Sequence, residues 1–297
     1  MSNAPAGRRA AAVPMPVARV VALTVLAMLA FAGNSLLCRM ALKHTTIDAA
    51  SFTTIRLASG ALMLWLLVRV RGGSHPGAGN WRSACALFVY AAAFSFAYLS
   101  LTAATGALLL FGAVQATMIG HGLWSGERLR KLQWVGLVLA LGGLVGLLSP
   151  GLSAPPVAGS VLMLGAGVAW GVYSLRGKAA GDPTRVTAGN FLRVVPMAVV
   201  LSLVMWGGAA LDRAGIAYAL ASGALASAVG YAVWYTALPA LKSTQAATVQ
   251  LSVPVIAALG GLVFLGEPLS LRLVLASVAV LGGIALVILE KRRGNAA

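Results

Sequence analysis

Charged residues are scarce in this chain. They make up 9% of its 297 residues, whereas hydrophobic residues make up 60%. A soluble domain carries roughly 25% charged residues because its surface faces water. The composition therefore excludes a soluble globular protein and indicates a surface that faces lipid. The 35 glycines agree with this, because small residues let membrane helices approach one another closely.

Acidic residues number only six, and each lies in a loop or at the end of an apolar run. They are Asp48, Glu127, Asp182, Asp212, Glu267 and Glu290. Carriers that use a proton or sodium gradient commonly place an ionisable residue inside the membrane. The sequence has no carboxylate well inside an apolar run, and His121 stands near the end of one. It therefore predicts transport that is not coupled to protons.

The chain has only two cysteines and no ATP-binding motif. Cys38 and Cys85 lie in or at the ends of apolar runs, so we interpret them as packing residues and not as a disulfide. The chain lacks the Gly-x-x-x-x-Gly-Lys-Ser/Thr loop that cradles ATP phosphates, which excludes direct drive by ATP. No cofactor and no metal site are predicted.

The dominant positive feature is a series of ten apolar runs. A helix needs about 20 apolar residues to cross a bilayer, and ten such helices use nearly the whole chain. The sequence therefore predicts an all-α membrane protein with ten transmembrane helices and no separate soluble domain. The runs cover 17–38, 48–69, 82–102, 105–124, 132–149, 157–176, 185–206, 214–237, 243–265 and 271–289.

The net charge of +16 comes from short basic clusters between the apolar runs. Such clusters do not form the continuous basic face of a nucleic-acid-binding protein, so nucleic acid is not an expected partner. The segments on the side of the N-terminus hold 16 Lys and Arg residues, and those on the other side hold 4. Under the positive-inside rule both termini are cytoplasmic. We expect a disordered cytoplasmic tail at 1–16, a basic cytoplasmic tail at 291–297, a lipid bilayer around the chain, and a monomer.

The two halves of the chain resemble each other at an offset of about 140 residues. Gly126-Glu127-Arg128-Leu129 aligns with Gly266-Glu267-Pro268-Leu269. Leu141-Gly142-Gly143 likewise aligns with Leu281-Gly282-Gly283, and Arg56 aligns with Arg193. Because matches at arginine, glutamate and Leu-Gly-Gly keep their order, chance similarity among Ala, Leu and Gly is an insufficient explanation. The sequence predicts two five-helix repeats, at 17–150 and 151–290.

An odd number of helices in each repeat has a topological consequence. The second repeat must cross the membrane in the opposite orientation to the first. Inverted repeats are the architecture of secondary transporters, which bind their substrate between the halves near the middle of the membrane. The repeat therefore indicates a transporter.

The same residues resemble a known family. Ten spans, an aromatic residue beside Gly or Ala in the first and sixth spans, an arginine in the second and seventh, and Leu-Gly-Glu at the end of the ninth resemble the drug/metabolite transporter superfamily, EamA type. Within it the chain looks most like the bacterial aromatic amino-acid exporters, which implies an inner-membrane location. Pro254 in the ninth span aligns with Val114, so the first half lacks the proline, and the kink it would supply is expected on one side only.

Polar and aromatic side chains within the spans are the candidates for a binding site. Uncharged polar groups in lipid face a cavity or bond a neighbouring helix, and aromatic residues line pockets or pack in the core. Both alternatives remain open for each residue. The predicted substrate-binding set is Trp170, Tyr98, Trp234, Gln250, Asn34, Gln115, Tyr173 and Phe94.

Five other residues are predicted to have structural roles. Arg56 and Arg193 each lie about 12 Å along their spans by helix rise, and we expect them to bond helix carbonyls, with recognition of a ligand carboxylate as the alternative. Glu127 and Glu267 each follow a glycine at the end of a span and are expected to tie that turn to the next helix. Pro254 is expected to shape its helix.

The resulting functional hypothesis is a carrier that exports neutral and aromatic amino acids by alternating access. Export of another small metabolite or drug is the alternative, and a passive channel is a further one. An intramembrane protease is disfavoured, because Gly33-Asn34-Ser35 is one of several Gly-x-Ser matches and no histidine lies mid-span to activate a serine. The chain is not expected to be an enzyme.

Overall fold

The computed structural model describes residues 15–72, 78–126, 128–151, 154–177, 182–241, 246 and 249–294, with side chains described up to residue 288. Most of the predicted tail at 1–16 lies outside these residues, as does Glu127. The predicted tail at 291–297 is described only as far as Gly294, where the last helix ends.

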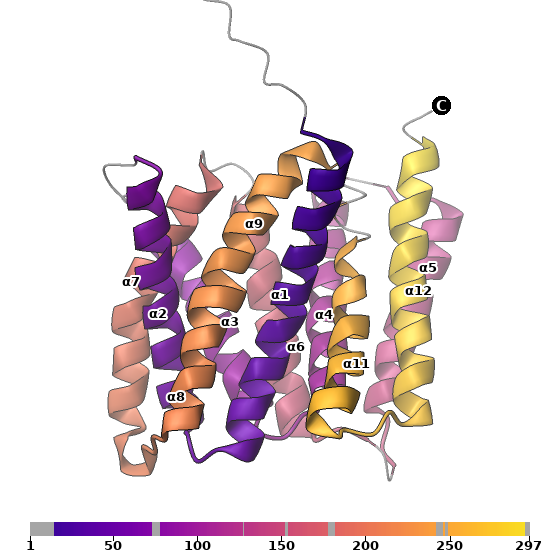
Figure 1. Cartoon of the computed structure of the whole chain (residues 1–297). Coiled ribbons are helices and arrows are strands. Elements are labelled where there is room, and N and C mark those ends of the chain that lie inside the picture. The colour runs from indigo at the N-terminus through magenta and orange to yellow at the C-terminus, as the bar shows by residue number, and fades with distance from the viewer. Residues whose placement is uncertain are drawn as a thin grey trace, which may run out of the picture.

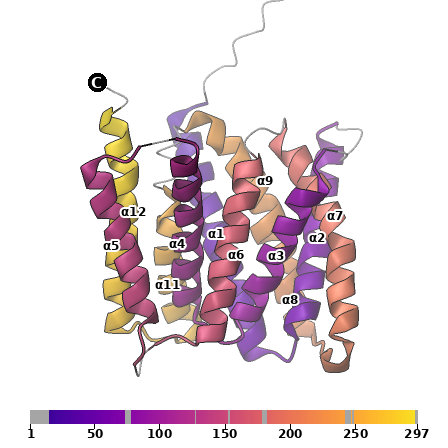
Figure 2. The same ribbon diagram turned by 180° about the vertical axis from the view of Figure 1, so that it is seen from behind.

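The described residues form a bundle of helices that lie side by side (Figures 1 and 2), and they contain no strand. The first half of the chain contributes α1 (Val17–His44), α2 (Ala49–Val70), α3 (Trp81–Ala97), α4 (Ala103–Trp124) and α5 (Lys131–Leu148). The second half contributes α6 (Val157–Gly177), α7 (Pro183–Val204), α8 (Arg213–Leu220), α9 (Gly230–Ala237), α11 (Ser252–Leu265) and α12 (Leu271–Gly294).

These helices match the ten predicted spans. Eight helical segments are long and apolar enough to cross a membrane, with Arg213–Ala240 counted as one, and α3 and α11 are shorter apolar helices. The prediction of an all-α membrane protein with ten helices is confirmed. Three helix ends differ most from the prediction: α1 continues past residue 38 to His44, α3 ends at Ala97 and not at 102, and α12 continues past residue 289 to Gly294. Arg39 and Lys43 end the apolar run without ending the helix, because both side chains bond groups on other helices.

Side-chain caps explain where several helices begin. An N-cap oxygen accepts a hydrogen bond from a backbone N–H that has no partner within the first turn. Asp48 caps α2 by accepting from the N–H groups of Ala50 and Ser51, both at 2.9 Å. Asn80, Thr102, Asp182 and Asp212 cap α3, α4, α7 and α8 in the same way.

Two of these aspartates also join the halves of the chain. The second carboxylate oxygen of Asp48 accepts the N–H of Ala210 at 2.9 Å. In return, the Oδ2 of Asp212 accepts the N–H of Thr46 at 2.8 Å. The loop before α2 and the loop before α8 are therefore linked by reciprocal hydrogen bonds. Hydrogen bonds from the N–H of Gly215, from the hydroxyl of Thr45 and from the N–H and hydroxyl of Thr46 hold the pKa of the Asp212 carboxyl at about 2, below its usual range.

The two halves of the chain interdigitate in the bundle. α2 packs against α7, α3 and α4 pack against α6, and α1 packs against α9 and α11. α5 and α12 form a closely packed pair at one side of the bundle (Figures 1 and 2). Most helix packing therefore joins an element of one half to an element of the other, and the core belongs to both.

Glycines permit the closest of these approaches. A Cβ at Gly223 would collide with the backbone carbonyl of Arg56 and the hydroxyl of Ser59 on α2. In the α5–α12 pair, a Cβ on Gly136 would lie 2.5 Å from the carbonyl oxygen of Gly283. Backbones at these positions touch directly, which is the packing that small residues allow between membrane helices.

A π-helical segment, Ala221–Val229, connects α8 to α9, so the three segments form one continuous helix. It packs against α1 and α2 and carries buried Ser222 and Ser227. Because π-helical turns are rare and occur mostly at functional sites, this segment marks the part of α8–α9 that faces the binding region described below.

Successive long segments run in alternating directions along the bundle. α1 starts at the same end of the bundle at which α12 finishes, and α6 starts at the opposite end (Figures 1 and 2). α1 and α6, the first helices of the two halves, therefore run in opposite directions.

Candidate functional site

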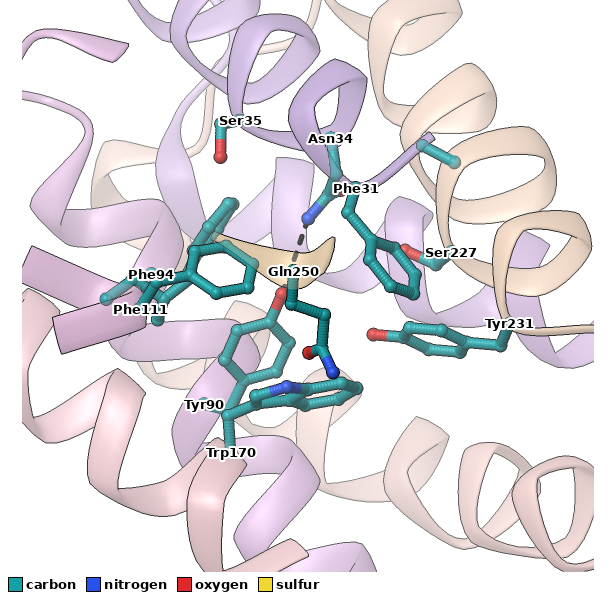
Figure 3. A pocket seen from close by; sticks show the side chains of 12 residues that line it. Phe31, Asn34, Ser35, Tyr90, Phe94, Phe111, Trp170, Ser227, Tyr231 and Gln250 are labelled. Atoms are coloured by element: carbon teal, nitrogen blue, oxygen red, sulfur yellow. Dashed lines mark hydrogen bonds between the residues drawn. The ribbon is translucent and has the colours of Figure 1, made fainter. Parts of the chain in front are cut away.

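A cavity lies between the two halves, near the middle of the bundle, and Figure 3 shows its lining. Its volume is about 30 Å³, which is room for one or two water molecules. α1, α3 and α4 form one wall, and α6, the segment Ala221–Tyr231 and Gln250 form the other. The lining residues are Phe31, Asn34, Ser35, Tyr90, Phe94, Leu110, Phe111, Trp170, Ala226, Ser227, Tyr231 and Gln250.

Four of the eight predicted substrate-binding residues line this cavity: Trp170, Gln250, Asn34 and Phe94. Trp170 comes from α6, Gln250 from the helical residues 249–250 just before α11, Asn34 from α1 and Phe94 from α3, and these segments are distant in the sequence. The structure therefore brings together an indole, two amides and a phenyl ring from both halves.

The other four predicted residues lie behind the lining. Tyr173 stacks on Trp170 with ring centroids 5.4 Å apart, and Trp234 meets the edge of Phe31 at 6.1 Å. Tyr98 is fully buried against Gly106, and its hydroxyl donates to the carbonyl of Ala103 at 3.4 Å. Gln115 is buried in α4. In this conformation these residues support the cavity wall and do not reach the cavity.

Stacked aromatic rings form one side of the cavity (Figure 3). The indole of Trp170 stacks on Tyr231 with centroids 5.2 Å apart and an interplanar angle of 23°. The ring of Tyr90 lies 4.8 Å from the same indole at a tilt of 44°. Offset and tilted pairs of this kind each contribute about 0.5–1.5 kcal/mol beyond their buried area. The wall is therefore apolar, with exposed ring faces and two phenolic hydroxyls.

A chain of buried, hydrogen-bonded polar groups meets this aromatic side at Tyr90. The hydroxyl of Ser222 donates to Asn34 Oδ1 at 2.7 Å. Asn34 Nδ2 donates to the hydroxyl oxygen of Tyr90 at 3.3 Å, and Arg56 Nη2 donates to the same oxygen at 3.1 Å. The chain connects α2, α3, α1 and the π-helical segment. Asn34 and Tyr90 carry it into the cavity lining.

Arg56 occupies an unusual environment at the end of this chain. Its side chain is 2% exposed, and its guanidinium carbon lies 4.9 Å from the ring centroid of Phe94 and 5.4 Å from that of Tyr90. Its Nε and Nη1 have no hydrogen-bond partner among the described residues. Ring faces stabilise the cation in part, but no carbonyl anchors it.

Arg193 behaves differently, although it aligns with Arg56. Its Nη1 donates to the carbonyl of Gly189 at 2.8 Å and to that of Ala78 at 3.4 Å. This is the carbonyl-bonding geometry expected from the sequence for both arginines. The two matching positions therefore differ in environment, because Arg56 faces aromatic rings and Arg193 faces backbone carbonyls.

Glu267 joins helices from both halves at the end of the bundle where α11 finishes. Its Oε1 accepts from Arg39 Nε at 2.8 Å, with Lys43 Nζ at 3.9 Å. Its Oε2 accepts the N–H of Ala103, the first residue of α4, at 2.7 Å. Glu267 thus ties its turn to α1 and α4, and not to the following helix, α12, as the sequence alone suggested.

Pro254 lies in the first turn of α11, after a turn at Leu251. A proline is tolerated there because the first-turn N–H groups have no partner within the helix. The position sets the start of α11 and places Gln250 just before it. Leu251, a turn residue, separates the helical residues 249–250 from α11 at this point.

Several lining residues were absent from the predicted set. Tyr90 and Tyr231 had a signal, since each belongs to a cluster of aromatic residues within one span. Phe31 belongs to the aromatic–Ala pair noted in the first span. Ser35 and Ser227 had no signal, because single serines are common in apolar spans. Among the described residues, no group of three His, Cys, Asp or Glu side chains could hold a metal ion.

Comparison with known proteins places the chain among transporters. The model of the EamA-like transporter family matches residues 18–149 and again residues 157–289. An uncharacterized protein of Pseudomonas aeruginosa is 62% identical over 284 residues, which cover 95% of this chain and 99% of that protein. The threonine/homoserine exporter RhtA of Escherichia coli is 29% identical over 280 residues, 90% of each chain.

A solved crystal structure shares the fold. It covers 93% of this chain and 98% of its own, with a TM-score of 0.67 and 18% sequence identity. At that identity the likeness concerns the arrangement of the helices alone.

Proposed function

Since the chain belongs to the EamA-like transporter family, and is therefore a multi-pass membrane transporter, we propose that it exports neutral amino acids, aromatic ones included, by alternating access. The observation that carries this proposal is the cavity between the halves. Aromatic rings line both of its walls, and a few polar groups lie among them, including the hydrogen-bonded Asn34 and Tyr90. Small organic solutes bind in sites of this composition.

The relatives support the amino-acid class. The Escherichia coli exporter that aligns along 90% of both chains is named for threonine and homoserine, two small neutral amino acids. The aromatic lining, with Trp170 stacked on Tyr231 at 5.2 Å, supports the inclusion of aromatic amino acids among the solutes, because a planar side chain would extend this stack.

The way the halves are built supports alternating access. The family model matches twice, and helices α1 and α6 run in opposite directions. We infer an inverted repeat, with the cavity at its interface, as in other secondary transporters. The proposed location is the bacterial inner membrane with both termini in the cytoplasm, an orientation that the basic loops favour.

The size of the cavity indicates which state the structure represents. A volume of about 30 Å³ is too small for any amino acid, so the aromatic wall and Gln250 must separate before a solute enters. The described conformation is therefore one in which the cavity is closed. Opening towards one side and then the other would produce transport.

Efflux from liposomes tests the proposal directly. Purified protein would be reconstituted into liposomes, and separate preparations would be loaded with L-threonine, L-phenylalanine, uridine, glucose or a lipophilic cation. We expect saturable efflux of both amino acids, accelerated by the same amino acid on the opposite side. Flux that rises linearly with concentration would contradict a carrier and indicate a channel.

The same experiment separates the second candidate function. An aromatic wall with few polar groups also accommodates lipophilic drugs and other small metabolites. Efflux of the cation or of uridine, with no movement of either amino acid, would replace the amino-acid proposal by that alternative. Empty liposomes provide the control for leakage.

A further inference from the structure

The charge of Arg56 has no counter-ion among the residues that the structure describes. Among the described residues there are two ion pairs, both at Glu267, and neither involves Arg56. A buried cation is costly unless it is paired and its hydrogen-bond donors are satisfied. Arg56 makes one hydrogen bond, to Tyr90, and two of its three nitrogens have no partner among these residues.

A purely structural arginine would look like Arg193. The Nη1 of that residue bonds two backbone carbonyls, which fixes the position of the guanidinium. Arg56 sits at the matching position of the first half but contacts ring faces in place of carbonyls. Its unused donors therefore point to a partner that is present during only part of the transport cycle.

Tyr90 connects Arg56 to the cavity. Its hydroxyl oxygen accepts one hydrogen bond from Arg56 and one from Asn34. A phenolic oxygen that already accepts two hydrogen bonds directs its own hydrogen elsewhere. Because Tyr90 lines the cavity, that hydrogen is available to a solute. The donors on the other side of the oxygen make the hydroxyl a stronger donor.

The sign of the local charge selects the ligand. No acidic residue lines the cavity, and Arg56 lies directly behind two of its lining residues, Tyr90 and Phe94. The region around Tyr90 is thus positive and uncompensated. A carboxylate entering there would accept a hydrogen bond from the Tyr90 hydroxyl, and its negative charge would balance that of Arg56.

We propose that the Arg56–Tyr90 pair binds the carboxylate of the transported solute. This inference rests on the proposed function and names the group by which the carrier recognises an amino acid. The side chain of the solute then faces the Trp170–Tyr231 stack. Its ammonium group faces the ring faces and Gln250 Oε1, since Gln250 Nε2 is occupied by the carbonyl of Ala246 at 3.2 Å. The assignment replaces the structural role that the sequence favoured for Arg56.

The test compares ligands with and without a carboxylate. Equilibrium binding of L-threonine, L-phenylalanine and their carboxamides would be measured on the purified protein and on Arg56→Gln and Arg56→Lys variants. We expect the unmodified protein to bind each acid at least 10-fold more tightly than its amide. Arg56→Gln should weaken binding of the acids by about 10- to 100-fold, as for loss of a charge-assisted hydrogen bond, and leave the amides within about 3-fold.

Arg193→Gln is the matched control. It makes the same substitution at the aligned position of the other half, where the guanidinium bonds carbonyls. Any effect on binding should then be equal for acid and amide. Arg56→Lys, which keeps the charge, should retain more affinity for the acids than Arg56→Gln does.

Several outcomes would overturn the proposal. An equal loss for acids and amides in Arg56→Gln would make Arg56 a structural residue. Equal affinity of the unmodified protein for acids and amides would also rule out a carboxylate site. This comparison holds even if the Arg56→Gln variant fails to fold. A third outcome concerns inorganic anions. If Arg56→Gln binds the acids as tightly as the unmodified protein does but loses a dependence of binding on chloride, the partner of Arg56 is an inorganic anion.

Failure of the proposed function gives a different result. If neither amino acid binds but L-lactate binds and depends on Arg56 in the same way, the amino-acid assignment falls and the carboxylate site stands. If amino acids are transported with no dependence on Arg56, the carboxylate site falls and the proposed function stands.

Discussion

At the scale of single residues, depth in the bundle separates two aromatic side chains that the sequence treats alike. Trp170 is half-buried and lines the cavity, whereas Tyr98 is fully buried with its ring against Gly106. Both were expected to line a pocket. The three-dimensional surroundings of a ring, and not its place in the sequence, distinguish a ring that faces a ligand from one that packs in the core.

The corresponding prediction contrasts Trp170→Ala with Tyr98→Ala. Removing Trp170 should weaken solute binding by about 3- to 10-fold, the equivalent of one aromatic contact. Its loss of stability should be smaller than that of Tyr98→Ala, because the ring already borders a cavity. Removing Tyr98 should lower the free energy of unfolding by about 3–5 kcal/mol. Binding isotherms and thermal unfolding in detergent measure the two effects. Normal binding by a folded Trp170→Ala variant would remove Trp170 from the site.

Asp212 provides a prediction for acidic conditions. Hydrogen bonds from backbone N–H groups, first that of Gly215, hold the pKa of its carboxyl at about 2, whereas the unfolded chain has a value of roughly 3.9. Because the folded pKa is the lower one, Asp212 stabilises the fold above pH 4, and this contribution is lost as the pH falls from about 4 to 2. Unfolding in detergent should therefore become easier over that interval.

Asp212→Asn is the variant that isolates this effect. It keeps an oxygen that can accept the N–H of Gly215 but cannot titrate. We expect its stability to depend less on pH between 4 and 2 than that of the unmodified protein. Identical pH profiles would show that the Asp212 link does not contribute to acid sensitivity.

At the scale of helices, the closest approach of α2 and the π-helical segment depends on Gly223. A methyl group there would collide with the carbonyl of Arg56 and with Ser59. Gly223→Ala should therefore destabilise the protein by about 1–3 kcal/mol. Because the collision displaces the backbone at Arg56, solute binding should also decrease.

Gly146→Ala in α5 is the matched control. No atom lies within 4 Å of a Cβ at Gly146, and alanine is the better helix former by up to about 1 kcal/mol. We expect unchanged or slightly increased thermal stability. Equal behaviour of the two variants would mean that α2 and the π-helical segment can move apart without cost.

Helices are also the level at which the sequence predicted most. Lipid requires long apolar helices with satisfied backbones, so composition alone located the ten spans to within a few residues at most ends. The π-helical segment left no such mark, because its letters are ordinary small residues. Arg56 and Arg193 could not be told apart either. Their partners come from the opposite half of the chain, and a pattern within one half does not contain them.

At the scale of the whole molecule, orientation in the membrane remains a prediction. The sequence suggests Gly73, Ser153 and Gly181 as labelling positions, and these lie outside the described residues. Ser125, after α4, and Gly208, after α7, are exposed and described. In a background where exposed Cys85 is replaced by serine, we expect Gly208→Cys to react with an impermeant thiol reagent in intact cells. Ser125→Cys should react only after lysis.

Labelling with the opposite sidedness would reverse the orientation inferred from the basic loops. Labelling of both variants in intact cells would place the two positions on one side of the membrane. That result would contradict the alternating directions of the helices between them.

The driving force is a second property of the whole molecule. Asp48, Asp182 and Asp212 are all caps at helix starts, and Glu267 is paired with Arg39 at a helix end. None of these described carboxylates lies where protonation would shift the balance between open states. With equal amino acid on both sides of a liposome, a pH gradient of 1.5 units, worth about 2 kcal/mol per proton, should cause no accumulation. Accumulation that a protonophore abolishes would establish proton coupling.

The interdigitation of the two halves has a consequence for synthesis of the protein. α1 packs against α9 and α11, which leave the ribosome roughly 190 residues after α1 at about 5–20 residues per second. For some 10–40 s the early helices must therefore stay in the bilayer without the partners that cover their polar groups. During that interval Arg56 and Asn34 have neither Ser222 nor the rest of the second half beside them. Insertion of the first half is thus the step at which the growing chain depends most on the membrane insertion machinery.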